Sequence, residues 1–176
     1  MVNVKKTGSD PACIDEALIE RASHVAKHLQ TKRLMVVTAE SCTAGLISAV
    51  LSETEGASEI LHGSFVTYTK ANKAKALGVD RDLLERSGSV NAEVVRQLIK
   101  GALERSPADI ALAVSGVLGP APDEDGNPVG LVYLGCGLRT QTPTIVRKDY
   151  GDRPHDVLRR ETVLDALTLL NTCATQ

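Results

Sequence analysis

The feature that most constrains the fold is an alternation of short apolar runs with segments in which apolar residues recur at helical spacing. This spacing, together with end signals, predicts helices over 14–29, 44–51, 70–77, 80–86, 91–105 and 156–170. The apolar runs predict strands over 34–39, 60–68, 110–115, 130–138 and 144–150, and the last two follow each other directly. This order predicts an α/β fold, a three-layer α/β/α sandwich whose mixed, mostly parallel sheet has about five strands.

The composition supports this fold class and argues against several kinds of partner. Of 176 residues, 43% are hydrophobic but only 2% are aromatic, so the core must consist mainly of Ala, Val, Leu and Ile, which suits buried parallel strands. With few aromatic rings and a net charge of −2, the chain has neither stacking platforms nor a basic footprint for nucleic acid. No apolar run reaches membrane-spanning length, and residues 1–10 lack the apolar stretch of a signal peptide. We expect a cytoplasmic protein with no nucleic-acid or membrane partner.

The length of the chain predicts one domain over residues 12–176, preceded by a loose N-terminal leader over residues 1–11. The four cysteines contain no C-x-x-C pair, and no histidine lies at zinc-ligand spacing from them. We expect free thiols and no metal site, because a domain of this size without secretory signals rarely has a disulfide framework.

Three polar or glycine-rich segments follow the ends of predicted strands: ESCTAG at 40–45, YTKANK at 68–73 and SGVLGP at 115–120. In open α/β sheets, ligands bind outside the carboxyl ends of the strands. The sequence therefore predicts a site where these three segments meet.

The first of these segments has two interpretations. Ser41 lies where a strand turns into a helix, and serine is favoured there simply as a helix cap. The same turn exposes a hydroxyl beside backbone N–H groups that can hold an oxyanion, and with a base Ser41 becomes a nucleophile. Cys42 is a second candidate nucleophile, although a lone cysteine in such a turn is more often a small buried side chain.

The other segments are also open to two interpretations. Lys70, Lys73 and Lys75 either form a solvated helix face or include a general base whose pKa is lowered by burial or by nearby cations. Since the sequence has no Ser-His-Asp pattern, a hydrolase built on Ser41 needs a lysine or tyrosine as its base. The loop 116–128 either wraps a ligand or is a plain surface connection. Arg153, before the last helix, is either a phosphate clamp or surface charge.

Taken together, these segments resemble one family, the C-terminal domain of the competence/damage-inducible protein CinA, whose stand-alone members are nicotinamide-nucleotide amidases. The resemblance runs from about residue 34 to residue 170. It is carried by AESCTAG at 39–45, GSFVTYTKANKAKALGV at 63–79, SGVLGP at 115–120, NPVG at 127–130 and GDR at 151–153.

The resemblance implies hydrolysis of the carboxamide of nicotinamide mononucleotide to nicotinate mononucleotide and ammonia. Ser41 would be the nucleophile and Lys73 its base, with Tyr68 beside them, and the backbone N–H groups of Cys42 and Thr43 would hold the oxyanion. The partner would be a small nucleotide, no metal or other cofactor is implied, and we expect a homo-oligomer, a dimer or larger. The implied substrate-binding residues are Glu40, Gly45, Ser115, Gly116, Gly119, Arg153 and Arg159.

The sequence also departs from the family pattern. Ala44 replaces a usual glycine, Lys70 replaces a usual asparagine, Val117-Leu118 replaces Ile-Ala, and the acidic stretch APDEDGN at 121–127 replaces a glycine-rich one. The altered loop 116–127 favours an alternative function, a catalytically altered relative that only binds a nucleotide or a protein partner. A plain interaction domain is a third possibility.

Overall fold

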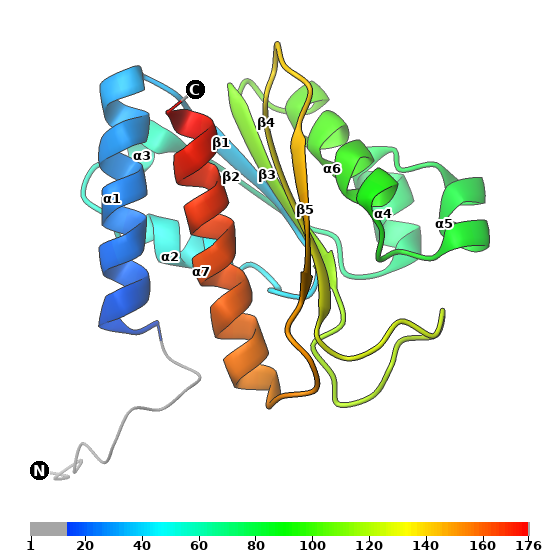
Figure 1. The fold of residues 1–176 in the computed structure, drawn as a ribbon. Helices are drawn as coiled ribbons and strands as arrows, with labels where there is room; N and C mark the ends of the chain where they lie inside the picture. The colour runs from blue at the N-terminus through cyan, green and yellow to red at the C-terminus, as the bar shows by residue number, and fades with distance from the viewer. Residues whose placement is uncertain (1–13, 176) are drawn as a thin grey trace, which may run out of the picture.

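The computed structural model describes residues 14–175, and the predicted leader over 1–11 lies outside this part of the chain. Five strands form one sheet with helices on both of its faces (Figure 1). The strands are β1 (Val36–Glu40), β2 (Leu61–Val66), β3 (Ile110–Gly116), β4 (Leu131–Leu138) and β5 (Thr144–Asp149). The helices are α1 (Glu16–Lys32), α2 (Leu46–Ser52), α3 (Ala57–Ile60), α4 (Lys70–Leu77), α5 (Arg81–Ser87), α6 (Ala92–Glu104) and α7 (His155–Ala174). The α/β fold and the mixed five-stranded sheet are confirmed.

The order of the strands explains where a site can form. The sheet runs β2-β1-β3-β4-β5, with β1 parallel to both β2 and β3, and with β4 antiparallel to both β3 and β5. Four strands therefore share one direction and only β4 is reversed. The carboxyl ends of β2, β1 and β3 lie next to one another, so the three segments singled out in the sequence meet at one edge.

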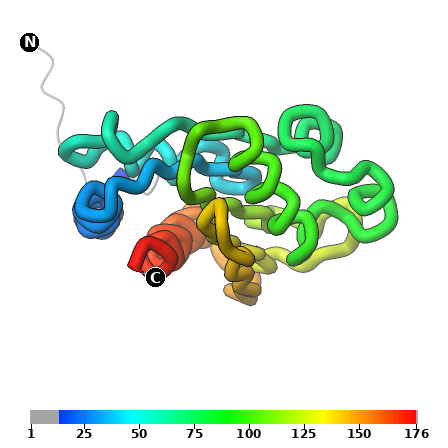
Figure 2. Tube along the Cα trace, turned by 90° about the horizontal axis from the view of Figure 1, so that it is seen from above, coloured from blue at the N-terminus to red at the C-terminus, as the bar shows by residue number. Residues whose placement is uncertain are grey.

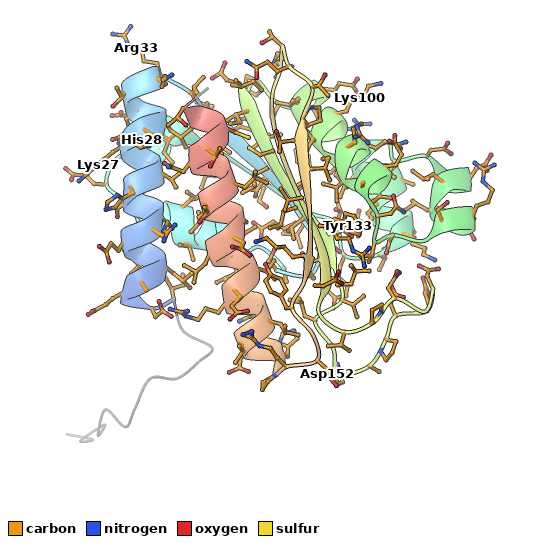
Figure 3. The ribbon with its side chains drawn as sticks, in the orientation of Figure 1. Lys27, His28, Arg33, Lys100, Tyr133 and Asp152 are labelled. Carbon is orange, nitrogen blue, oxygen red and sulfur yellow. The ribbon has the colours of Figure 1, made fainter. Side chains whose placement is uncertain are left out.

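The core has two layers because successive residues of a strand face opposite sides of the sheet. In β1, Val36 packs with residues of α1, α2 and α7, whereas Val37 and Ala39 pack with residues of α4, α5 and α6. Helices α1 and α7 lie side by side on the first face (Figure 2). Figure 3 shows Lys27, Arg33 and Lys100 at the periphery, where charged side chains stay hydrated.

Several helix ends follow the sequence closely. The side chain of Asn91 accepts a hydrogen bond from the N–H of Val94 at the start of α6, and Gly78 ends α4 in the left-handed conformation. Helix α2 begins at Leu46 rather than at residue 44, because Ala44 and Gly45 are left-handed. The one-turn helix α3 was not predicted. Among residues 14–175, no helix combines the length and the apolar character needed to cross a membrane.

Candidate active site

The turn after β1 places Ser41 at the carboxyl edge of the sheet. Its N–H donates to the carbonyl of Val114 at 3.2 Å, which extends the pairing of β1 with β3 by one residue. The chain then reverses through Ala44 and Gly45, with φ angles of 53° and 93°, before α2 begins. Ser41 lies at the start of this turn and is only 7% exposed.

Glu40 is buried beneath this turn. Its carboxylate accepts hydrogen bonds from the N–H groups of Gly45, Ile47 and Ser48 at 3.0, 3.1 and 2.9 Å, and from the Thr43 hydroxyl at 2.7 Å. The first N–H groups of a helix have no acceptor within the helix, and Glu40 supplies one. The Glu40 carboxylate has no exposed surface and holds the turn together, so the structure gives it a role in the fold, while its implied substrate-binding role stays a prediction. Gly45 likewise gives its N–H to Glu40 and does not line the cavity described below.

Lys73, from the first turns of α4, is the lysine that reaches Ser41. Its ammonium nitrogen lies 2.8 Å from Ser41 Oγ, 2.8 Å from the carbonyl oxygen of Thr67 and 3.4 Å from that of Tyr68. The side chain has no exposed surface, and this burial lowers the pKa of Lys73 from 10.5 to about 8. Of the two causes considered from the sequence, burial and nearby cations, burial is the one that lowers the pKa of Lys73 here.

The contacts of Lys73 suit a general base. A neutral amine has one lone pair and two N–H groups, so it can accept the Ser41 hydroxyl proton while donating to the two carbonyl oxygens. With a pKa of about 8, an appreciable fraction of Lys73 is neutral at ordinary pH. The pair Ser41–Lys73 is thus arranged for proton transfer without a histidine.

Cys42 differs from Ser41 although it is the next residue. Burial raises the pKa of its thiol to about 12, so it stays protonated at neutral pH and is a poor nucleophile. This favours Ser41 over Cys42, a choice that the sequence left open. The N–H groups of Cys42 and Thr43 donate to no protein oxygen within residues 14–175, but both lie beside the Cys42 thiol, and they stay our candidates for holding an oxyanion.

A cavity of about 240 Å³ opens beside Ser41. It brings together the three segments at the strand ends, the start of α7 and the chain just before α6. Its lining consists of Ser41, Cys42, Tyr68, Ser89, Val90, Gly116, Val117, Leu118, Gly119, Ala121, Asp123 and His155. Gly116 and Gly119, two of the implied substrate-binding residues, are part of this lining.

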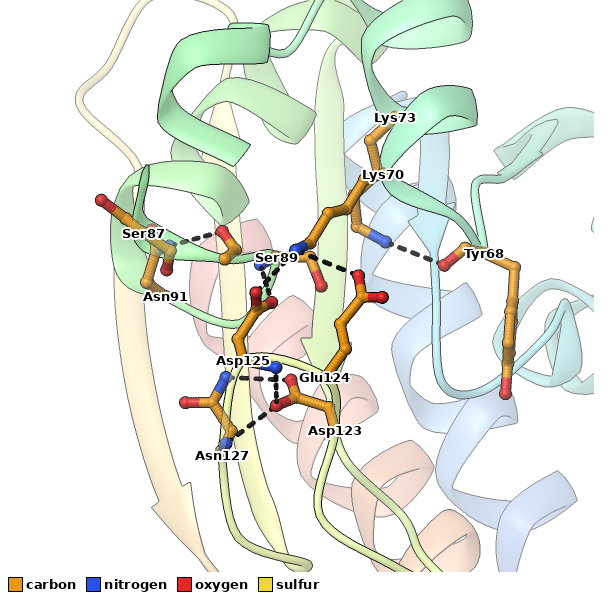
Figure 4. Close-up of polar contacts among 11 residues, drawn as sticks. Tyr68, Lys70, Lys73, Ser87, Ser89, Asn91, Asp123, Glu124, Asp125 and Asn127 are labelled. Carbon is orange, nitrogen blue, oxygen red and sulfur yellow. Dashed lines mark hydrogen bonds and ion pairs between the residues drawn. The ribbon is translucent and has the colours of Figure 1, made fainter. Parts of the chain in front are cut away.

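Other implied residues take different positions. Tyr68 gives its carbonyl to Lys73, but its ring is 67% exposed and its hydroxyl points away from Lys73 (Figure 4). The Ser115 hydroxyl donates to the carbonyl of Ser89 at 2.7 Å and does not line the cavity. Arg153 is paired with Glu161, and neither Arg153 nor Arg159 lines the cavity.

Two of the departures from the family pattern contact each other. Lys70 Nζ lies 2.6 Å from Asp125 Oδ1 and 3.0 Å from Glu124 Oε1, and Asp125 also accepts the N–H of Ser89 at 3.3 Å (Figure 4). The hydrogen bond to Asp125 raises the pKa of Lys70, so this lysine stays charged. The acidic loop is therefore tied to the start of α4 and to the chain before α6, and forms one wall of the cavity.

Sequence reasoning missed several of these residues. Ser89 and Val90 precede a helix cap, and nothing in their pattern indicates a cavity wall. Asp123 and His155 lay inside segments that were noticed but not assigned. The Thr67 carbonyl is a backbone group, so only its place in the motif at 63–79 pointed to it. Within residues 14–175, no three His, Cys, Asp or Glu side chains are grouped to hold a metal ion.

The left-handed turn gives a stability prediction. An L-residue at φ 53° is strained by about 1–2 kcal/mol, which glycine relieves at an unfolded-state cost of about 0.4–1 kcal/mol. We expect Ala44→Gly to raise the free energy of unfolding in urea by roughly 0.5–1 kcal/mol. The matched change Ala49→Gly, inside α2, should lower it by about 1 kcal/mol. Destabilisation by both changes would contradict this account of the turn.

The fold and the Ser41–Lys73 contact define a class of protein: an α/β domain with a serine and a buried lysine at the carboxyl edge of a mixed sheet. Within that class, the chain belongs to the CinA C-terminal domain family, whose model matches residues 19–174. The competence/damage inducible protein CihA of Agrobacterium tumefaciens has a similar structure, with a TM-score of 0.87 and 36% identity over 94% of this chain and 99% of that one.

Two relatives illustrate the range of proteins that contain this domain. The nicotinamide-nucleotide amidohydrolase PncC of Pseudomonas putida is 38% identical over 146 residues, which cover 83% of this chain and 90% of that protein. A CinA-like protein of Akkermansia muciniphila is 43% identical over 123 residues, which cover 70% of this chain but 29% of that protein. This chain spans about a third of the length of several curated relatives that it matches.

Proposed function

We propose that this protein is an amidase that hydrolyses the carboxamide of nicotinamide mononucleotide to nicotinate mononucleotide and ammonia. The observation that carries the proposal is the 2.8 Å contact between Lys73 Nζ and Ser41 Oγ beside a cavity, with burial lowering the pKa of the lysine to about 8. The similarity to the amidohydrolase of P. putida supports this choice of substrate.

The proposed reaction has two stages. Lys73 takes the proton of Ser41 as Oγ attacks the carboxamide carbon, and the resulting oxyanion lies against the N–H groups of Cys42 and Thr43. The Lys73 ammonium then protonates the departing nitrogen, which leaves as ammonia, and an ester between Ser41 and the acid remains. Water hydrolyses this ester with Lys73 again acting as the base.

The size of the cavity limits how much of the substrate it encloses. Its volume of about 240 Å³ lies below the roughly 300–1,000 Å³ of ordinary ligand pockets, so it suits the pyridine carboxamide, with the ribose phosphate at the rim. Arg153 lies two residues before His155, which lines the cavity, and remains our candidate for the phosphate. To bind it, Arg153 must leave Glu161.

The test is ammonia release from nicotinamide mononucleotide by the purified protein across a range of pH. Only neutral Lys73 accepts the Ser41 proton, so kcat/KM should rise with pH, reach half of its maximum at a pH of about 8 and then level off. An active wild type whose kcat/KM is independent of pH from 6 to about 10 would rule out the lysine base. A wild type that binds the nucleotide but releases no ammonia would favour the binding-only alternative, which the altered loop 116–127 supports.

A further inference from the structure

Three hydroxyl side chains lie in a row across the carboxyl edge of the sheet. Glu40 pairs with Val66 of β2 on one side and with Val114 of β3 on the other. The ladder continues by one residue, since the N–H of Thr67 donates to the Glu40 carbonyl at 2.8 Å and the N–H of Ser41 donates to that of Val114. Thr67, Ser41 and Ser115 are therefore neighbours, and the alternation of the strands places all three side chains on the face that α4 and α6 cover.

Two of these hydroxyls have partners and the third has none. The Ser41 hydroxyl is hydrogen-bonded to Lys73, and the Ser115 hydroxyl donates to the carbonyl of Ser89. The Thr67 side chain is 1% exposed, yet its Oγ1 contacts no hydrogen-bond partner within residues 14–175. A buried hydroxyl without a partner is unfavourable, and such a group in a native protein calls for an explanation.

The hydrogen-bond partners of Lys73 change during the reaction, and this change explains why the Thr67 hydroxyl is left without a partner. An ammonium has three N–H groups, and before the reaction its three acceptors are Ser41 Oγ and the carbonyl oxygens of Thr67 and Tyr68. In the tetrahedral intermediate, before the nitrogen leaves, Ser41 Oγ is bonded to the substrate carbon and is a weaker acceptor than the free hydroxyl. At that stage Lys73 is protonated and buried, and it lacks its third acceptor. Thr67 is the residue whose carbonyl already lies 2.8 Å from Lys73 Nζ, and its hydroxyl is unused.

We propose that the Thr67 hydroxyl is a positioning group that accepts the third N–H of the Lys73 ammonium after Ser41 Oγ has bonded to the substrate. This inference rests on the proposed Ser41–Lys73 mechanism. It explains why a hydroxyl is buried here without a partner in the resting protein: its partner arises during the reaction. The Thr67 carbonyl contacts Lys73 and Thr67 does not line the cavity, so the effect of Thr67 is on the rate of forming the covalent bond.

The experiment uses a phosphonofluoridate probe, whose reaction does not depend on the identity of the amide substrate. Ser41 Oγ forms a bond to phosphorus, the P–F bond breaks, fluoride leaves and the Ser41 proton passes to Lys73. The rate is measured by fluoride release against pH for wild type, Thr67→Val, Thr67→Ala and Thr67→Ser. The matched control is Thr162→Val, because Thr162 is buried in α7 and donates to the carbonyl of Leu158, away from the cavity.

We expect Thr67→Val and Thr67→Ala to lower the plateau rate by about tenfold or more, as loss of a hydrogen bond to a charged group does. Thr67→Ser should stay within about threefold of wild type, since it keeps the hydroxyl. The pH midpoint near 8 should not move, because Ser41 Oγ still accepts a hydrogen bond from the Lys73 ammonium before the reaction. The melting temperature of Thr67→Val should not fall, since the change removes an unpaired hydroxyl.

Other results would overturn the proposal. A wild-type rate in Thr67→Val or Thr67→Ala would mean that Lys73 has no need of the hydroxyl. A shifted pH midpoint together with a lower melting temperature would mean that Thr67 only packs the site. A wild type that does not react with the probe would refute both the serine–lysine mechanism and this inference. A wild type that reacts but does not hydrolyse nicotinamide mononucleotide would refute the proposed substrate alone.

Discussion

Replacing Lys73 with methionine should lower kcat for amide hydrolysis by about 10³-fold, and replacing Ser41 with alanine should lower it by at least about 10². Methionine fills the buried space of Lys73 but offers no basic nitrogen, so nothing within reach removes the Ser41 proton. Lys73→Arg should not restore activity, because a guanidinium stays protonated. Ammonia release at saturating substrate measures the effect.

The matched control is Lys75→Met, which removes an exposed lysine of the same helix and should leave kcat unchanged. Full turnover by Lys73→Met would exclude the lysine as the base.

The same variant tests whether burial lowers the pKa of Lys73. The pKa is 10.5 in the unfolded chain and about 8 in the folded protein, so between these values the unfolded chain binds more protons. Unfolding then becomes less favourable as pH rises, and the free energy of unfolding of wild type, relative to Lys73→Met, should rise by about 3 kcal/mol from pH 7 to pH 10.5. Guanidinium unfolding of both proteins at each pH measures this difference. Parallel curves would mean that the pKa of Lys73 is not lowered.

Replacing Glu40 with glutamine should lower the free energy of unfolding by about 3 kcal/mol, the second large effect. The carboxylate accepts three backbone N–H groups at 3.0, 3.1 and 2.9 Å, and both of its oxygens are used. Glutamine has one oxygen and an NH₂ group, so a buried donor would face another donor. Since Glu40 immediately precedes Ser41, kcat should also fall. Urea unfolding measures the effect on stability, and ammonia release measures the effect on kcat.

The matched control for Glu40 is Glu85→Gln, because Glu85 is an exposed carboxylate in α5. This change should alter the free energy of unfolding by less than about 0.5 kcal/mol. If Glu40→Gln were as mild as Glu85→Gln, the carboxylate would not be what holds the turn. Retained stability with lost activity would instead favour the substrate-binding role that the sequence suggested.

The sequence predicted the fold better than the site because the two depend on different information. Hydrophobic periodicity is local, and it located all five strands and most helices. The Ser41–Lys73 pair came from motif resemblance, since a Lys- and Ala-rich helix by itself indicates a solvated face. The burial of Lys73 depends on how α4 packs on the sheet, and no local pattern reports it.

Glu40 and Lys70 show what local patterns cannot supply. The role of Glu40 depends on a left-handed turn that brings N–H groups five, seven and eight residues ahead back onto its carboxylate. Lys70 and Asp125 lie 55 residues apart in the chain, so each looked like an isolated departure from the family until the fold placed them 2.6 Å apart. Both cases require tertiary geometry.

Whether Ser41 is the nucleophile is tested by identifying the residue that is acylated during turnover. Wild-type protein is mixed with excess nicotinamide mononucleotide, quenched in acid within a few turnovers, digested and mapped by mass spectrometry. We expect an ester on Ser41 that is absent from the Ser41→Ala and Lys73→Met proteins. An adduct on Cys42, or ammonia release at full rate from Ser41→Ala, would contradict it.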